Sequence, residues 1–134
     1  MELQRVVSLF FSPTGGTAKV AETLGGALTE QLGLPLEQYS FTRPAEREKA
    51  YNFTEKDLVL VVSPTYAGKL PNKILPDFRE KFCGNGAVAV PVVTFGNRSY
   101  DNSLAELCAL LEEKGFRSAA INAVQAAAKK SRAL

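Results

Sequence analysis

Val6–Thr17 reads Val-Val-Ser-Leu-Phe-Phe-Ser-Pro-Thr-Gly-Gly-Thr and changes character twice along its length. Its first six residues are nearly all apolar, as in a strand that is covered on both faces. The residues that follow are small, polar and turn-forming, which indicates a loop. From Thr17 to Leu32 the apolar residues recur at helical spacing, and Gly33 offers a C-cap. This part of the chain therefore predicts a strand, a loop and a helix in succession.

The same alternation continues along the rest of the chain. Apolar runs predict further strands at 34–40, 58–62, 87–95 and 119–124. Helical spacing predicts helices at 73–82 and 103–114, with a capping box at Ser103–Glu106 and a single turn at 45–49. Pro91 predicts an edge strand or a bulge, because proline removes a ladder donor. The alternation predicts an α/β fold, with a doubly wound five-stranded parallel sheet that has helices on both faces.

The composition fits a single domain over residues 1–134 and excludes several kinds of chemistry. The chain of 134 residues is 46% hydrophobic and 22% charged, which is ordinary for a globular protein, and no apolar run is long enough for a membrane helix. The absence of His excludes a Ser-His-Asp or Cys-His nucleophile and an imidazole metal site. Two cysteines without a CxxC spacing favour a reducing cytoplasm. A net charge of +2 is too small to predict a nucleic-acid partner.

The first loop predicts an anion site. Ligands of parallel sheets bind at the carboxyl ends of the strands, and backbone N–H groups at the start of a helix hold anions. Ser12, Thr14 and Thr17 add hydroxyl groups, and the loop contains no Lys or Arg. These uncharged donors suit a phosphate monoester, since neither a P-loop nor a GxGxxG pattern is present. The alternative is an ordinary turn with Thr17 as the N-cap.

Two aromatic loops follow the third and fourth predicted strands. The first contains Tyr66 between small residues, and the second contains Tyr100. A tyrosine can lie flat on a planar ligand, although Tyr66 could instead pack on its own helix. Two aromatic walls beside a phosphate site fit FMN, which joins a planar ring to a phosphate monoester. The candidate FMN-binding residues are Ser12, Thr14, Gly15, Gly16, Thr17, Pro64, Thr65, Tyr66, Ala67, Gly68, Phe95, Gly96, Asn97, Arg98, Tyr100 and Asp101.

These motifs resemble those of the flavodoxin family over essentially the whole chain. Ser12–Thr17 is similar to the flavodoxin phosphate loop, (S/T)-x-T-G-x-T. Pro-x-Tyr-Ala-Gly-x-x-Pro at Pro64–Pro71 and Gly-Asn-Arg-x-Tyr-Asp at Gly96–Asp101 resemble the flavodoxin-like domains that precede a two-cluster ferredoxin domain in some anaerobe proteins. The resemblance therefore implies a sheet order of 2-1-3-4-5.

The resemblance also implies roles for the loop residues. Ser12 and Thr14–Thr17 would bind the phosphate, and Tyr66 and Tyr100 would flank the isoalloxazine. Backbone around Ala67–Gly68 and Gly96–Asn97 would contact its N5 and pyrimidine edge. The implied partner is a redox protein, for example a ferredoxin-type iron–sulfur domain.

Three features depart from the usual flavodoxin pattern. Flavodoxins are usually strongly acidic, whereas this chain has a net charge of +2, so an acidic face is not expected to select its partner. Arg98 beside the ring is expected to favour anionic reduced flavin and to raise the potential. Only residues 126–134 remain for the last helix, which is expected to be short or missing, and no cysteine-rich ferredoxin segment is present. These features predict a domain of a longer protein, an incomplete gene product or a shortened variant, and an incompletely covered sheet face that permits a homodimer.

The leading functional prediction is an FMN-binding electron carrier, since a flavin carries electrons without acid–base side chains. One alternative is an FMN-dependent NAD(P)H reductase, although Lys69 and Arg98 are the only basic residues in the two ring loops. Another is a flavodoxin-fold module that binds no flavin. Cys83 and Cys108 are interpreted as thiols without a redox role, and Arg47–Lys49 as a solvated face.

Overall fold

A five-stranded parallel sheet forms the centre of the computed structural model, which describes residues 3–13, 15–65, 70–71, 74–94 and 103–118. The strands lie in the order β2-β1-β4-β6-β7, and each neighbouring pair is parallel. Numbered along the chain, the order is 2-1-3-4-5, so the predicted fold class and topology are confirmed. The strands are β1 (Arg5–Phe10), β2 (Leu36–Ser40), β4 (Asp57–Pro64), β6 (Val88–Thr94) and β7 (Arg117–Ser118).

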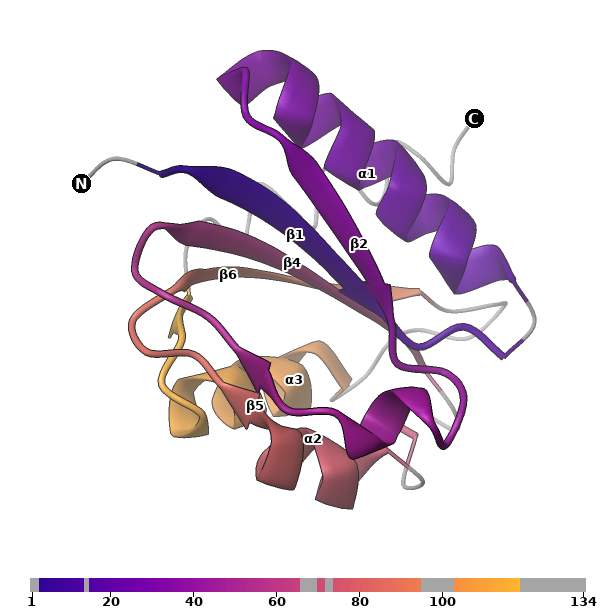
Figure 1. Cartoon of the computed structure of the whole chain (residues 1–134). Coiled ribbons are helices and arrows are strands. Elements are labelled where there is room, and N and C mark those ends of the chain that lie inside the picture. The colour runs from indigo at the N-terminus through magenta and orange to yellow at the C-terminus, as the bar shows by residue number, and fades with distance from the viewer. Residues whose placement is uncertain (1–2, 14, 66–69, 72–73, 95–102, 119–134) are drawn as a thin grey trace.

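Helices lie on both faces of this sheet (Figure 1). α1 (Gly16–Leu32) covers one face, and α2 (Leu75–Lys81) and α3 (Ser103–Glu113) cover the other. Successive residues of a strand therefore point into different cores, with Val6 on the α1 side and Val7 on the side of α2 and α3. Both side chains are fully buried. Burial on both faces explains why the inner strands β1, β4 and β6 are largely apolar instead of alternating.

The helix boundaries follow from local sequence signals. α1 ends where Gly33 adopts a left-handed φ of 67°, and the Gly33 N–H donates to the Thr29 carbonyl at 2.8 Å. α2 begins at Leu75, so Pro76 lies in its first turn, where the missing N–H costs no hydrogen bond. The predicted single turn is present as the 3₁₀ helix η1 (Glu46–Glu48).

The structure corrects the expectation for Pro91. β6 lies between β4 and β7, so it is not an outer strand, and its pairing with β4 runs without a bulge over seven residue pairs. Its described pairing with β7 covers Val88 and Ala89. The Thr94 carbonyl, on the β4 side, accepts the Thr65 N–H at 2.8 Å. Backbone groups alternate between the two sides of a strand, so the Pro91 nitrogen points away from β4. The β4–β6 ladder therefore loses no donor.

A second sheet of two parallel strands was not predicted. β3 (Tyr51–Asn52) pairs with β5 (Phe82–Cys83). The Tyr51 and Phe82 rings lie 5.5 Å apart in a T-shaped arrangement and belong to the core on the α2 and α3 side. Strands of two residues have no readable periodicity, so the sequence pattern could not reveal them.

The last predicted elements lie largely outside the described residues. β7 pairs with Val88 and Ala89, just before the strand predicted at 119–124. Residues 119–134, which include the expected short last helix, are not described. Among the helices that the structure does describe, none is long and apolar enough to cross a membrane.

Candidate functional site

The carboxyl ends of β1, β4 and β6 meet at one edge of the sheet. The Phe11 N–H, just past β1, donates to the Val62 carbonyl at 3.2 Å. The Thr65 N–H, just past β4, donates to the Thr94 carbonyl at 2.8 Å. The Thr17 hydroxyl lies 3.1 Å from the Thr94 hydroxyl and so joins the start of α1 to the end of β6. The structure therefore brings together the described ends of all three predicted loops.

The loop after β1 presents open backbone donors at the start of α1. Gly15 has a left-handed φ of 91° at the N-cap position, a conformation that glycine adopts without strain. Ser12 Oγ accepts the Ala18 N–H at 2.9 Å and caps the helix from outside. The N–H groups of Gly16 and Thr17 have no partner among the described residues. Open N–H groups at the positive end of a helix dipole form a suitable site for an anion.

The structure contradicts one part of the alternative interpretation of this loop, in which Thr17 is the N-cap. Gly15 occupies the N-cap position and has no side chain of its own with which to cap the helix. Thr17 is buried, with 6% of its surface exposed, and its hydroxyl pairs with that of Thr94. Thr14 lies outside the described residues.

Polar residues at the end of β2 and just after it form a hydrogen-bond network with this loop. Thr42 Oγ1 accepts the Ser12 N–H at 2.8 Å and shares a hydrogen bond of 3.1 Å with the Ser40 hydroxyl. The Thr42 carbonyl accepts from Arg47 Nη1 at 3.0 Å. Arg47 is only 7% exposed, so the interpretation of Arg47–Lys49 as a solvated face is wrong at its first residue. The sequence contains no signal that separates Arg47 from the polar residues around it.

Most residues predicted to surround the flavin ring lie outside the described residues. These are Tyr66, Ala67, Gly68, Phe95, Gly96, Asn97, Arg98, Tyr100 and Asp101. Their roles stay predictions, whereas Pro64 and Thr65 lie at the same sheet edge as the loop after β1.

Glu106 holds the segment between β4 and α2. Its Oε1 accepts the Leu70 N–H at 2.8 Å. The sequence had indicated a capping box in which Glu106 turns back to Ser103. In the structure, the Glu106 carboxylate links Leu70, which follows the first predicted ring loop, to α3, which follows the second. Glu106 therefore connects the two segments that flank the predicted ring site.

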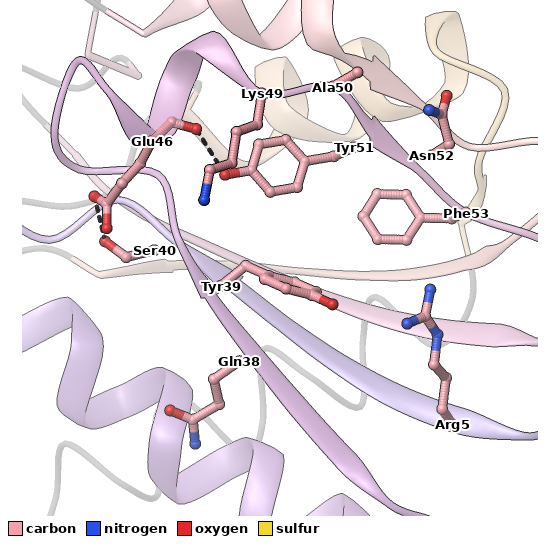
Figure 2. A pocket seen from close by; sticks show the side chains of 10 residues that line it. All are labelled: Arg5, Gln38, Tyr39, Ser40, Glu46, Lys49, Ala50, Tyr51, Asn52 and Phe53. Atoms are coloured by element: carbon pink, nitrogen blue, oxygen red, sulfur yellow. Dashed lines mark hydrogen bonds between the residues drawn. The ribbon is translucent and has the colours of Figure 1, made fainter.

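A cavity of about 400 Å³ lies beside the outer strand β2, and its lining runs from Arg5 at the start of β1 to Ser40 at the end of β2 (Figure 2). The rings of Tyr39, Tyr51 and Phe53 line it. Two charged groups in its wall already have partners within the protein. Arg5 pairs with Asp57 and Glu37, and the Glu46 carboxylate accepts from the Ser40 hydroxyl and the Arg43 N–H. The cavity contains none of the predicted site residues.

A charged cluster joins β1, β2 and β4 at the amino end of the sheet, opposite the candidate site. Arg5 Nε donates to Asp57 Oδ1 at 2.7 Å, and its Nη1 donates to Glu37. Burial acts to raise the pKa of Asp57, but the hydrogen bonds from Arg5 and from the Thr54 N–H outweigh it, and the pKa is lowered. No group of three or more potential metal-binding Cys, Asp or Glu side chains occurs in the part of the chain that the structure describes.

Similarity to known proteins is clear at the levels of family and fold. The flavodoxin family model matches residues 9–132. A crystal structure from Bacteroides eggerthii, provisionally described as a flavoprotein, has a TM-score of 0.62 and 19% identity over 94% of this chain and 96% of that one. Another such structure, from Bacteroides uniformis, has a TM-score of 0.61 and 19% identity over 96% of this chain and 99% of that one. At such low identity the two structures show a shared fold. No curated protein matches the chain.

Proposed function

The chain belongs to the flavodoxin family, and from this premise we propose that it binds FMN and carries electrons to and from a partner protein. Bound FMN supplies the redox chemistry, because it accepts and donates electrons singly or in pairs. The protein binds and orients the cofactor and shields it from water. This role needs no acid–base side chain, which agrees with a chain that contains no His.

The hydrogen-bond pattern of the loop after β1 is the observation that carries the proposal. The N–H groups of Ser12 and Ala18 are engaged inside the protein, whereas those of Gly16 and Thr17 have no partner among the described residues. A phosphate monoester accepts hydrogen bonds from open N–H and hydroxyl groups and is favoured at a helix start. Ser12 and Thr14–Thr17 would hold the FMN phosphate in this way.

The ring of FMN is proposed to lie between Tyr66 and Tyr100. Support comes from the sheet, because the loops that carry these tyrosines follow β4 and β6, and both strands end beside the phosphate loop. The other proposed ring contacts are Pro64, Thr65, Ala67, Gly68, Phe95, Gly96, Asn97, Arg98 and Asp101.

The proposed partner is a redox protein, for example a ferredoxin-type iron–sulfur domain. The net charge of +2 favours a partner with an acidic face over the basic partner of an acidic flavodoxin. No disulfide joins Cys83 and Cys108, which suits a reducing cytoplasm. A homodimer stays a prediction.

Electron transfer can be tested by stopped-flow mixing of the FMN-loaded protein. After photoreduction, the protein is expected to reduce an oxidised two-cluster ferredoxin, and the flavin absorption returns as it does so. In a parallel experiment, NADPH is expected to leave the oxidised flavin unreduced on the same timescale. Rapid bleaching by NADPH without transfer to ferredoxin would identify a reductase instead.

A further inference from the structure

We infer that Arg47 is a positioning residue for the phosphate loop and acts on Ser12 through Thr42. The ligand in this inference rests on the proposed FMN function. The arrangement of Arg47, Thr42 and Ser12 concerns the protein alone and can be tested without flavin.

Arg47 is a buried charge whose guanidinium is incompletely hydrogen-bonded within the described part of the chain. Its guanidinium carbon lies 5.9 Å from the centroid of the Phe11 ring, which is a cation–π distance. Its Nε lies 3.2 Å from Oδ2 of Asp77, in the first turn of α2. Arg47 and Asp77 therefore form an ion pair but no hydrogen bond, since the buried Nε makes no hydrogen bond among the described residues. Burying a guanidinium in this way is costly, so a purely structural role would be filled as well by an apolar side chain.

Two routes connect Arg47 to the phosphate loop. Through hydrogen bonds, Arg47 Nη1 donates to the Thr42 carbonyl at 3.0 Å, and Thr42 Oγ1 accepts the Ser12 N–H at 2.8 Å. Through packing, the guanidinium lies against Phe11, the residue directly before Ser12. The planar guanidinium can make both contacts at once, whereas a lysine ammonium offers only a point charge.

These contacts determine which backbone donors remain open. Because the Ser12 N–H donates to Thr42, the Ser12 Oγ is oriented to accept the Ala18 N–H at 2.9 Å. The N–H groups of Gly16 and Thr17 are then left for a phosphate. Without Arg47, Thr42 and Phe11 lose a contact that fixes them, and the donors at the start of α1 lose their common orientation. The predicted contacts to the flavin ring come from other loops. The loss of affinity should therefore affect binding of the phosphate and not of the ring.

Amide hydrogen exchange in the flavin-free protein tests the structural part. In Arg47→Met, which keeps the side-chain length and removes the charge, the Ser12 and Ala18 amides are expected to exchange about tenfold faster. The amides of β4 are expected to keep their protection. Arg79→Met is the matched control, because Arg79 is 59% exposed and lies 3.8 Å from Glu113 on the surface. Unchanged exchange at Ser12 and Ala18 in Arg47→Met would overturn the inference.

Comparison of FMN with riboflavin, which lacks the phosphate, tests the consequence for binding. Arg47→Met is expected to weaken the binding of FMN about tenfold and the binding of riboflavin by less than about twofold. Thr42→Val, which removes the hydroxyl and keeps the shape, is expected to show the same selective loss, and Arg47→Lys should recover part of it. Equal losses for both ligands, or no loss in Thr42→Val, would contradict the inference. Failure of the unaltered protein to bind either flavin would instead refute the proposed function, while amide exchange still decides the role of Arg47.

Discussion

The Thr17 hydroxyl joins the first loop to the end of β6, and its removal gives a prediction at the scale of one residue. Thr17→Val keeps the shape of the side chain but leaves Thr94 Oγ1 without its partner at 3.1 Å. We expect the free energy of unfolding to fall by about 1 kcal/mol. We also expect FMN affinity to fall about tenfold, because the variant lacks a hydroxyl that is proposed to donate to the phosphate. Urea denaturation and flavin titration measure the two effects.

Thr29→Val is the matched control, since it makes the same substitution in the same helix. Thr29 Oγ1 is buried and has no partner among the described residues, so its removal should not reduce stability. FMN affinity should stay unchanged. Equal losses of FMN affinity in both variants would contradict the role assigned to Thr17.

The sequence predicts the loop residues that belong to a local motif and misses those that support them from a distance. Ser12 lies just past β1 and Thr17 lies in the first turn of α1, in agreement with the loop pattern. Thr42 is 30 residues from Ser12, and Thr94 is 77 residues from Thr17. Such contacts form only when the sheet order brings separate strands together. Arg47 was misjudged for the same reason, because its burial depends on α2 and on Phe11.

At the scale of elements, a substitution at Gly84 tests how the segment between β5 and β6 packs on the residues that follow α3. A Cβ at this position would lie 2.6 Å from the Phe116 nitrogen and 2.7 Å from the Gly115 carbonyl carbon. Both are backbone atoms, so relief requires the chain itself to shift. Gly84→Ala is therefore expected to lower the free energy of unfolding by about 1–3 kcal/mol.

Gly26→Ala gives the opposite expectation for the same change. Gly26 lies in α1 with nothing within 4 Å of an added Cβ. Alanine should raise the free energy of unfolding by about 0.5–1 kcal/mol, because it restricts the unfolded chain and favours helix. Chemical denaturation of both variants provides the measurement. A Gly84→Ala protein as stable as the original would refute this packing.

Element length decides how well the fold can be predicted. α1, β4 and β6 are long enough to show a helical or continuous apolar pattern, and their positions are predicted within a few residues. β3 and β5 have two residues each, and they pair where tertiary contacts, such as the packing of the Tyr51 and Phe82 rings, bring them together. Pro91 misled the prediction because its sequence context does not show which side its nitrogen faces.

The whole molecule should respond to acid but not to changes around neutral pH. The chain contains no His, so the free energy of unfolding should be nearly constant between about pH 5 and pH 8. The pKa of Asp57 is lowered in the folded state, as described above. The pKa of Glu46 is lowered too, because hydrogen bonds from the Arg43 N–H and the Ser40 hydroxyl outweigh the effect of burial. A lowered carboxyl pKa adds stability above the unfolded value of about 4, and this stability is lost as the pH falls through the folded value.

Asp57→Asn separates this contribution from general acid unfolding. Loss of the carboxylate leaves Arg5 with Glu37 as its acidic partner and should cost about 2 kcal/mol at neutral pH. The variant should also lose less stability than the original protein between about pH 4 and pH 2. Denaturant unfolding across this range provides the comparison. Parallel losses in the two proteins would show that Asp57 is not a source of the acid sensitivity.

FMN binding is the property on which the proposed function depends, and it can be measured by titrating the purified flavin-free protein with FMN. We predict one FMN per chain, with shifted visible absorption and quenched flavin fluorescence. Riboflavin should bind at least about tenfold more weakly, since it lacks the phosphate that the loop after β1 would hold. An FMN spectrum that stays that of the free flavin with protein in excess would contradict the proposal.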